Sequence, residues 1–369
     1  MKKILVWSIM AILVIGCDSK PETNQMHTLF VGTYTDGDSE GIYKLTFDSN
    51  TGILSEPKLS AVLPNPSFLV ISDDKKQLYS IQETKDFNGV NGGITSFSLN
   101  DGELSHLNTV DVGGAHPCHV TLSGNSQLAA ANYTGGSVSI FDLNADGSLK
   151  PDPQIIDHKV LDTAKVAHAH KVHFNKDGLF ASDLGLDAVK KYVQKDSSWI
   201  PAHQASLDLP DGAGPRHFEF NLDRSFLYVI NELNATIAVL KRDDEGSYNP
   251  IQTENTVAPD WEGVKSCADI HLSPDGKFLY GSNRGENTIV IFAVDQSTGK
   301  ISLIGRESVR GDWPRNFTID PTGNFVLVAN QKSNSITTFK RGIENGTMEF
   351  LSETKLSSPV CLVFLEETE

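Results

Sequence analysis

The sequence is poor in cysteine, and the four cysteines that it has form no recognisable framework. There is no C-x-x-C pair, and the three cysteines beyond Cys17 are an odd number that cannot fully pair. Cys118, Cys267 and Cys361 each stand near apolar residues, which is typical of small buried side chains. The composition therefore argues against a disulfide-stapled fold and against a cysteine-based metal site.

Other patterns are missing as well, and each absence disfavours a class of protein. No stretch of about 11 residues or more keeps a helical periodicity, which argues against a helical fold. The formal net charge is −16 and there is no basic tail, so we expect no binding of nucleic acid through a broad basic surface. The absence of a G-x-S-x-G elbow disfavours serine-hydrolase chemistry.

Two patterns suggest a metal at first, and neither predicts one. His168, His170 and His173 are neighbours in the sequence, but in a strand His173 faces away from the other two. Residues 36–40 (DGDSE) and 144–148 (NADGS) are similar to calcium loops but lack the full series of ligands, which favours hairpin turns. We expect no metal and no cofactor.

The N-terminus predicts an export signal. Lys2 and Lys3 precede an apolar stretch, residues 4–15, that is too short to span a bilayer and fits a signal peptide. Residues 14–17 (VIGC) resemble a lipobox, in which Cys17 becomes the lipidated first residue; the alternative is a plain signal peptide with a chance cysteine. We expect a signal peptide over 1–16, lipidated Cys17 and a polar tether over 17–26, and one domain over 27–369. The protein is then lipid-anchored in the cell envelope, facing the periplasm or the exterior, and meets the membrane only through this anchor.

The dominant pattern is a unit of about 50 residues that occurs seven times. Its core is a run that closes with a short polar triplet, and the last residues of successive runs are 47 to 52 positions apart. The runs are residues 29–34 (LFVGTY), 78–83 (LYSIQE), 128–133 (LAAANY), 179–184 (LFASDL), 227–232 (LYVINE), 279–284 (LYGSNR) and 326–331 (VLVANQ). A fixed period of this length predicts a repeat architecture.

One unit indicates how the repeat folds. Residues 215–221, 226–231 and 236–241 have strand patterns, a weaker strand follows near 251–257, and short turns separate them. Four antiparallel strands joined by short turns make a propeller blade. The chain starts with a second strand at residue 29 and ends with a first strand over 359–365, so we predict an all-β, seven-bladed β-propeller. Its ring is closed by pairing of the N- and C-terminal strands, which removes the exposed sheet edge.

Alignment of the predicted first strands brings unusual residues into two successive slots. The first slot holds Ser67, Cys118, His170, Arg216, Ala268, Arg315 and Val360, and the next holds Phe68, His119, Lys171, His217, Asp269, Asn316 and Cys361. The start of a first strand shares a rim with the end of its antiparallel neighbour, where the runs end in Glu83, Glu232, Arg284 and Gln331. We therefore expect imidazole, guanidinium and carboxylate groups around one mouth of the axis.

Several motifs resemble, in the same order along the chain, those of the lactonase family of seven-bladed propellers, typified by bacterial 6-phosphogluconolactonase. They are residues 32–35 (GTYT), 41–43 (GIY), 131–138 (ANYTGGSV), 168–174 (HAHKVHF), 183–187 (DLGLD), 214–220 (GPRHFEF), 228–233 (YVINEL), 272–285 (LSPDGKFLYGSNRG) and 314–331 (PRNFTIDPTGNFVLVANQ). GPRHF followed by NEL, SNRG and PRNF is the most specific part. The family also includes fungal enzymes that cyclise carboxymuconate, so the resemblance leaves the reaction open.

The resemblance implies a pocket built from one histidine, two arginines and one glutamate, as in the lactone-forming members. By motif these roles fall on His170, Arg216, Glu232 and Arg284, with His168 as the alternative to His170. For lactone opening, Arg216 and Arg284 are the candidates to stabilise the oxyanion, worth about 3 kcal/mol for one donor. His170 is the first candidate for the base that takes the water proton, and Glu232 is the second.

The remaining candidates are assigned to substrate binding. Arg315 and Lys171 are predicted to hold a phosphate or carboxylate of the substrate, and His119 and His217 complete the set. Each assignment has a structural alternative: Arg216 and Glu232 as an ion pair between blades, and His119, His170 and His217 as packed or hydrogen-bonded core histidines.

We expect a hydrolase similar to 6-phosphogluconolactonase that opens a sugar lactone, with a small and anionic lactone as its partner. An export signal conflicts with the cytoplasmic metabolism of phosphorylated gluconolactone, which leaves an unphosphorylated lactone open. Two alternatives remain: a non-catalytic ligand-binding propeller, whose mouth residues 83–93 and 157–167 would plug, and a carboxymuconate-type cycloisomerase.

Overall fold

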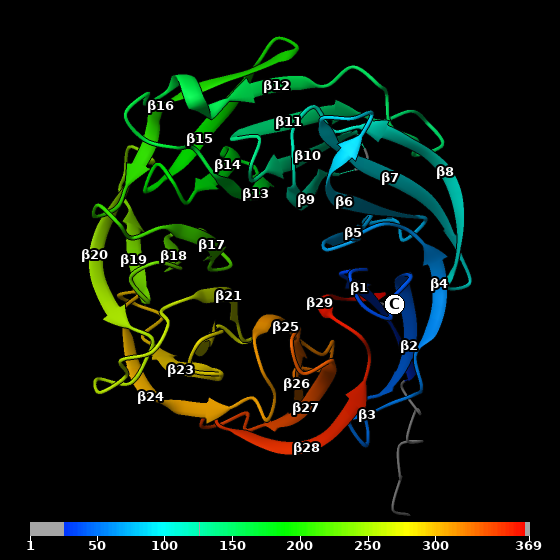
Figure 1. The fold of residues 1–369 in the computed structure, drawn as a ribbon. Helices are drawn as coiled ribbons and strands as arrows, with labels where there is room; N and C mark the ends of the chain where they lie inside the picture. The colour runs from blue at the N-terminus through cyan, green and yellow to red at the C-terminus, as the bar shows by residue number, and fades with distance from the viewer. Residues whose placement is uncertain (1–25, 125, 366–369) are drawn as a thin grey trace, which may run out of the picture.

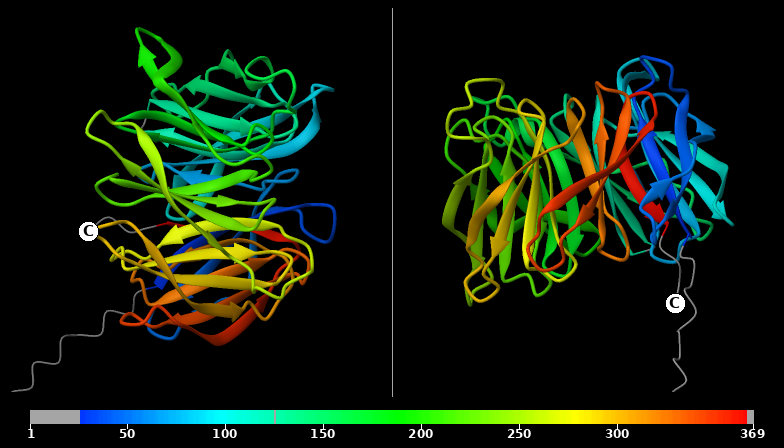
Figure 2. Two further views of the ribbon diagram at one scale, coloured as in Figure 1. Left: turned by 90° about the vertical axis from the view of Figure 1, so that its left-hand side faces the viewer. Right: turned by 90° about the horizontal axis from the view of Figure 1, so that it is seen from below.

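The structure, a computed structural model, describes residues 26–124 and 126–365 and is a seven-bladed β-propeller. The predicted fold is thus confirmed. Seen along the axis, the first strand of each blade lies nearest the centre and the last forms the outer wall (Figure 1). The side views show strands that run between two rims made of turns (Figure 2). The predicted signal peptide and Cys17 lie outside the described residues.

Six blades are four-stranded antiparallel sheets made from consecutive stretches of chain. The first three, from the axis outward, are β5 (Leu69–Ile71), β6 (Gln77–Phe87), β7 (Asn91–Asn100) and β8 (Glu103–Asp111); β9 (Pro117–Ser123), β10 (Gln127–Asn132), β11 (Ser137–Asp142) and β12 (Gln154–Asp157); and β13 (Ala169–Asn175), β14 (Gly178–Asp183), β15 (Ala188–Lys195) and β16 (Ser198–Asp208). The next three are β17 (Pro215–Phe220), β18 (Phe226–Asn231), β19 (Thr236–Arg242) and β20 (Tyr248–Asn255); β21 (Cys267–Leu272), β22 (Phe278–Asn283), β23 (Thr288–Val294) and β24 (Ile301–Ser308); and β25 (Pro314–Ile319), β26 (Phe325–Asn330), β27 (Ser335–Arg341) and β28 (Met348–Lys355). In the described part of the chain the only helix is the short 3-10 turn η1 (His158–Val160), and no helix there is long and apolar enough to cross a membrane.

The seventh blade joins the two ends of the chain, as the sequence predicts. Its order is β29 (Pro359–Leu365), β1 (Met26–Thr33), β2 (Gly41–Asp48) and then an outer edge in two pieces, β3 (Ile53–Leu54) and β4 (Lys58–Val62). The first strand is C-terminal and pairs antiparallel with the N-terminal β1, for example Leu29 with Phe364. The ring therefore closes through backbone hydrogen bonds between the two ends of the chain.

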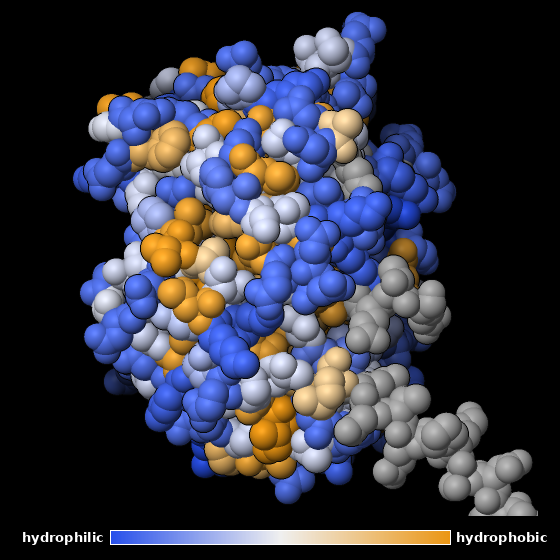
Figure 3. Space-filling model, turned by 90° about the vertical axis from the view of Figure 1, so that its right-hand side faces the viewer, coloured by the Kyte–Doolittle hydropathy of each residue, from blue (hydrophilic) through white to orange (hydrophobic). Residues whose placement is uncertain are grey.

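Apolar side chains fill the spaces between neighbouring blades. One cluster joins Tyr228 and Ile230 of β18 to Leu279 of β22 and Phe292 of β23, all fully buried. The outer wall is different, because its strands have one face in water. On the side where β4 and β8 lie, hydrophilic side chains dominate and apolar ones occur in small groups (Figure 3). This alternation is what half-buried outer strands require.

A tyrosine in the second strand repeatedly fastens one blade to the next. The hydroxyl of Tyr228 donates to the carbonyl of Gly299 at 3.1 Å, and its equivalents at two other junctions are Tyr79 to Gly147 (2.8 Å) and Tyr280 to Gly346 (2.9 Å). Gly299 has a φ of +72° and approaches the ring of Phe226 so closely that a Cβ atom would lie 2.1 Å from it. The turn that accepts the bond therefore requires glycine.

We expect Tyr228→Phe to lower the free energy of unfolding by about 1–2 kcal/mol, because the carbonyl of Gly299 loses its buried donor. Urea unfolding at pH 7 measures the loss. The matched control is Tyr43→Phe, since the Tyr43 hydroxyl only accepts a 3.3 Å bond from the exposed backbone of Glu40. Equal stability of the two variants would contradict a fastening role for Tyr228.

Candidate active site

The charged residues predicted at one rim converge on one cavity. His170, Arg216 and Arg315 stand near the starts of β13, β17 and β25, while Glu232 and Arg284 directly follow β18 and β22. The cavity has a volume of about 240 Å³ and is lined by Tyr34, Glu83, Cys118, Tyr133, His170, Arg216, Glu232, Arg284 and Arg315. Gln331, predicted at the same face, does not line it.

Glu232 holds two of the arginines. Its Oε2 lies 2.7 Å from Nη2 of Arg284 and 3.1 Å from Nε of Arg216, although the latter approach is too poorly directed for a hydrogen bond. Backbone carbonyls fix the same guanidinium groups: Arg216 donates to Ala268 at 2.6 Å and Arg284 to Cys267 at 3.1 Å. Both arginines are thus positioned before any ligand arrives.

Glu83 and Arg315 form a looser pair across the cavity. The carboxylate of Glu83 accepts hydrogen bonds from the hydroxyls of Tyr34, at 2.7 Å, and of Ser67. Nη2 of Arg315 is 3.7 Å from this carboxylate, and its guanidinium lies over the ring of Tyr34 at 5.2 Å. Arg315 is therefore less tightly engaged than Arg216 and Arg284 and has donors to spare.

Positive charge exceeds negative charge in this cavity. Three arginines face two glutamates, which leaves one net positive charge when His170 is neutral. Burial, followed by the neighbouring guanidinium groups of Arg284 and Arg315, lowers the pKa of Arg216 to about 9. Burial alone also lowers the pKa of Arg315, but Tyr34, Glu83 and Glu232 outweigh it and raise that pKa. An anion, or negative charge that develops during a reaction, relieves the repulsion among these cations.

His170 stands beside the arginines as a neutral group. It is 4% exposed, and burial, followed by Arg216 and His217, lowers its pKa well below the usual value. Its Nδ1 has no hydrogen-bond partner among the described residues, and its ring meets Tyr133 edge-on at 5.8 Å. A buried imidazole that is neutral at pH 7 can accept a proton from a bound water.

A family model described as "Lactonase, 7-bladed beta-propeller" matches residues 28–364 of the chain. The chain belongs to this lactonase family. It is 34% identical to a 6-phosphogluconolactonase of Bacillus subtilis over 92% of this chain and 98% of that protein. It is 36% identical to one of Formosa agariphila over 88% of this chain and 95% of that one.

Solved structures agree with this membership. A periplasmic gluconolactonase of Pseudomonas aeruginosa superposes with a TM-score of 0.87 at 34% identity, covering 93% of this chain and 99% of the other. A protein from Bacteroides fragilis described as a possible 6-phosphogluconolactonase gives a TM-score of 0.85, also at 34% identity, and covers 94% of this chain and 99% of the other. These likenesses confirm the resemblance inferred from the motifs and support a lactonase-type function.

The four residues that the lactonase motifs single out, His170, Arg216, Glu232 and Arg284, all line the central cavity. The alternative histidine, His168, does not line it. Its ring stacks on Tyr133 at 4.4 Å and borders a separate groove at the rim. The geometry thus favours His170 over His168 as the residue that faces a substrate, and the catalytic roles themselves stay predictions.

The four substrate-binding candidates lie in different places, and only Arg315 among them lines the central cavity. His217 lies beneath it, in a narrow chamber that shares Arg216 and Arg315 with the cavity, and bonds through Nδ1 to Asp269 at 2.7 Å. His119 lines none of the cavities described in this section, and its ring packs against Phe68 with the centroids 4.0 Å apart, the packing arrangement that the sequence left as its alternative. Lys171 lies farther along β13 and lines a cavity toward the opposite rim.

Two tyrosines and a buried aspartate of this lactonase escaped the sequence-based assignment. Tyr34 and Tyr133 line the cavity from the last positions of their repeats, the slot that also supplies Glu83, Glu232 and Arg284. Their position in this shared slot could have predicted that both tyrosines line the cavity. Asp269 is 1% exposed and pairs with His217 and His271, and no motif marks its role.

The two long segments proposed as plugs do not fill the mouth. Of the described residues in segments 83–93 and 157–167, only Glu83 lines the central cavity. The first segment continues β6 and turns into β7. The second contains η1 and is tied down by Lys165, which lies 3.0 Å from both Asp187 and Asp211.

We expect the buried histidines to make this protein acid-sensitive, and His119→Phe to reduce that sensitivity. Burial, followed by His217 and Lys171, lowers the pKa of His119 well below its usual value, so the unfolded chain takes up a proton near pH 6.5 that the folded chain refuses. Stability therefore falls as the pH drops below about 6.5, and one such histidine costs about 2 kcal/mol between pH 7 and pH 5. Urea unfolding at the two pH values should show a loss smaller by that amount in His119→Phe.

The matched control is His203→Gln, because His203 is exposed. The pKa of His271 is raised by Asp269 despite its burial, so this histidine contributes to the pH dependence of stability with the opposite sign. Its contribution is the same in both variants and cancels when their losses of stability are compared. If His119→Phe and His203→Gln lose the same stability on acidification, His119 is not neutral in the folded protein.

Proposed function

We propose that this protein is a lactone hydrolase that opens a sugar lactone by attack of water in the central cavity. The observation that carries the proposal is the convergence of Arg216, Arg284 and Arg315 on one small cavity beside a neutral imidazole. Lactone opening needs this combination: cationic donors where negative charge develops, and a base that accepts the proton of the water.

The reaction follows from the positions of these groups. Water attacks the lactone carbonyl carbon while His170 takes one of its protons, and the carbonyl oxygen becomes an oxyanion held by Arg216 and Arg284. The bond from this carbon to the ring oxygen then breaks, the carbonyl re-forms, and the proton on His170 passes to the departing ring oxygen. Glu232 keeps the two guanidinium groups oriented and is the alternative base.

The charge of the cavity favours a substrate without a phosphate. One net positive charge matches the single negative charge of an oxyanion, whereas a phosphoryl group brings about 1.5–2 negative charges of its own. The export signal predicted at residues 1–16 and the similarity to a protein named periplasmic gluconolactonase point the same way. We infer an unphosphorylated sugar lactone, such as gluconolactone, encountered in the cell envelope by a chain anchored at Cys17.

A binding propeller is the second candidate. The observation that favours it is the engagement of Glu232 with both Arg216 and Arg284, which leaves this carboxylate little freedom to act as a base. A carboxymuconate-type cycloisomerase is less well supported, because a tricarboxylate needs more positive charge than this cavity has in excess.

We expect Arg216→Gln to lower kcat for gluconolactone opening about 10²–10³-fold, because it removes an oxyanion donor. Purified protein without its first 25 residues is assayed against paired phosphorylated and plain gluconolactone, after subtraction of spontaneous opening. Arg310→Gln is the control, since Arg310 is exposed and, within residues 26–124 and 126–365, its side chain pairs only with Glu307. A folded wild-type protein that opens neither lactone faster than buffer would exclude the hydrolase and leave the binding propeller.

The pH profile identifies the base. Since burial and Arg216 depress the pKa of His170, wild-type kcat/KM should stay level from pH 8 to about 6.5 and fall only at lower pH, as His170 becomes protonated. His170→Gln should lose about 10²–10⁴-fold in kcat together with this acidic fall. Retention of the acidic fall in His170→Gln, and its loss in Glu232→Gln, would transfer the role of base to Glu232.

A further inference from the structure

The inner strands β13 and β17 have a second cluster of charged residues at the end away from the central cavity. Whereas His170 and Arg216 stand near the starts of these strands, Lys171, His173 and Glu219 lie farther along them. Together with Asn175 and Arg224 they line a cavity of about 220 Å³, close in volume to the central cavity. We call it the lower cavity. The lactonase chemistry proposed above makes no use of it.

The lower cavity contains hydrogen-bond donors that have no partner. Nδ2 of Asn175 and Nε of Arg224 are both buried and unpaired among the described residues. Nζ of Lys171, whose side chain is 12% exposed, comes no closer than 3.8 Å to the carboxylate of Glu219. Buried donors in folded proteins are nearly always paired, so the two unpaired donors of Asn175 and Arg224, beside the long ion pair of Lys171, favour an acceptor in this cavity.

The charges of the lower cavity specify the kind of acceptor. Lys171 and Arg224 bring two positive charges against the one negative charge of Glu219. His173 adds none at neutral pH, because burial, followed by Lys171 and Arg224, lowers its pKa to about 4. The lower cavity therefore has an excess of positive charge and a surplus of donors, which together favour a small oxyanion.

The backbone fixes the position from which the Arg224 side chain begins. Its φ of +62° lies in the left-handed region, and its N–H donates to the carbonyl of Asn221 at 3.0 Å while its own carbonyl accepts from Tyr248 at 2.8 Å. The same position of the first hairpin turn is occupied in other blades by Lys75, with a φ of +61°, and by glycines. The conformation therefore belongs to the shared turn, and what distinguishes Arg224 is its guanidinium group.

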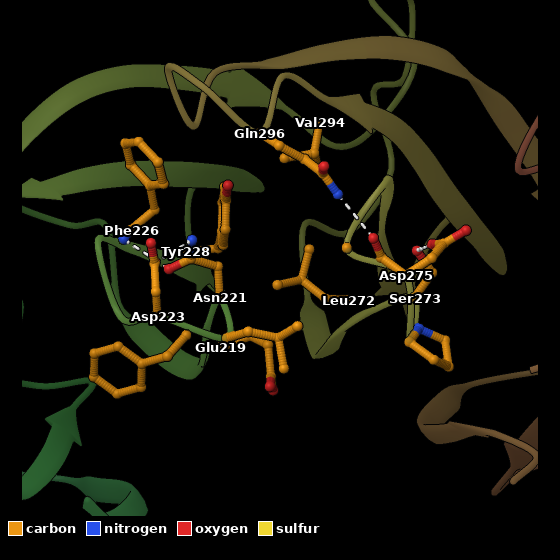
Figure 4. A pocket seen from close by; sticks show the side chains of 14 residues that line it. Glu219, Asn221, Asp223, Phe226, Tyr228, Leu272, Ser273, Asp275, Val294 and Gln296 are labelled. Carbon is orange, nitrogen blue, oxygen red and sulfur yellow. Dashed lines mark hydrogen bonds between the residues drawn. The ribbon is translucent and has the colours of Figure 1, made fainter. Parts of the chain in front are cut away.

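Among the described residues, none that lines a neighbouring hollow has a buried side-chain donor without a partner. This hollow, of about 430 Å³, lies between the first hairpin turns of the β17–β20 and β21–β24 blades (Figure 4). Its polar side chains are used within the turns: Gln296 donates to the carbonyl of Asp275, and Ser273 to the carboxylate of Asp275. The two spaces share Glu219 and Leu222, so the hollow offers room for the body of a ligand whose anionic group occupies the lower cavity.

We propose that the lower cavity is a second anion-binding site, in which Lys171, Arg224 and the amide of Asn175 hold the phosphate or carboxylate group of a small molecule. The site lies toward the opposite rim of the propeller from the central cavity. It does not depend on the proposed hydrolysis.

The test is titration of the protein, without its first 25 residues, with inorganic phosphate and separately with gluconate. The imidazole resonance of His173, which is assigned by its absence from the spectrum of His173→Gln, reports binding in the lower cavity and not in the central cavity. We expect a saturable shift and a rise in the pKa of His173 with one or both anions. Saturation by phosphate alone identifies a phosphoryl ligand, and saturation by gluconate alone identifies a carboxylate.

Two variants and a control make the result specific. Arg224→Gln and Lys171→Met should each weaken the binding at least tenfold, and Arg224→Gln should leave lactone hydrolysis unchanged. Arg310→Gln should bind as the wild type does, since Arg310 is an exposed arginine that shares the left-handed conformation, with a φ of +54°. The proposal is overturned if neither anion produces a saturable shift of His173, or if both variants retain wild-type affinity.

Discussion

The pairing of β1 with β29 is the constraint on which the rest of the structure depends. It turns seven sheets into a closed ring, and only a closed ring has an axis on which the starts of the first strands converge. The contact of the closing blade with the next is sterically tight: a Cβ atom on Gly32 of β1 would lie 2.2 Å from the carbonyl oxygen of Pro66. The two ends of the chain thus determine how closely residues from different blades meet at the centre.

Crowding at the axis removes charged groups from water, and the hydrogen bonds of one buried carboxylate offset part of the desolvation free energy. Asp269 in β21 bonds to His217 of β17 at 2.7 Å and accepts from Asn316 of β25 at 2.6 Å. Asn316 in turn accepts from the backbone of Leu362 in β29 at 2.8 Å. A single carboxylate therefore connects four of the seven inner strands. Such a network makes the relative rotation of these blades specific, because any other rotation leaves a buried charge unpaired.

The sequence was sufficient for the fold and for the charged residues of the cavity, but not for its two tyrosines or for the orientation of each side chain. The 50-residue period predicts blades, and the unmatched strands at the two ends predict the closure. Lys171 shows the limit. Its slot in the alignment placed it with the substrate, but no member of that slot lines the central cavity, whereas His170, Arg216 and Arg315 of the preceding slot do. Successive side chains of a strand point to opposite faces, and the alignment of residue types alone did not show which of the two slots faces the cavity. The choice of Glu232 for both arginines is likewise a matter of distances across blades, which repeat spacing does not contain.

The distribution of charge gives this lactonase fold two separate ways to select a ligand. The whole chain carries −16, so its outer surface repels anions, yet salt limits that repulsion to about 8 Å at physiological ionic strength. Within the ring, positive charge is in excess at both ends of the inner strands, and the histidines between them, His119 and His217, are neutral because burial lowers their pKa values. The carboxylate of Asp269 also lies between the two ends, and its charge is taken up by hydrogen bonds to His217 and His271. Under the two proposals made above, each cavity retains its own excess of positive charge, matched to an oxyanion that forms during lactone opening at one end and to a permanent anion at the other.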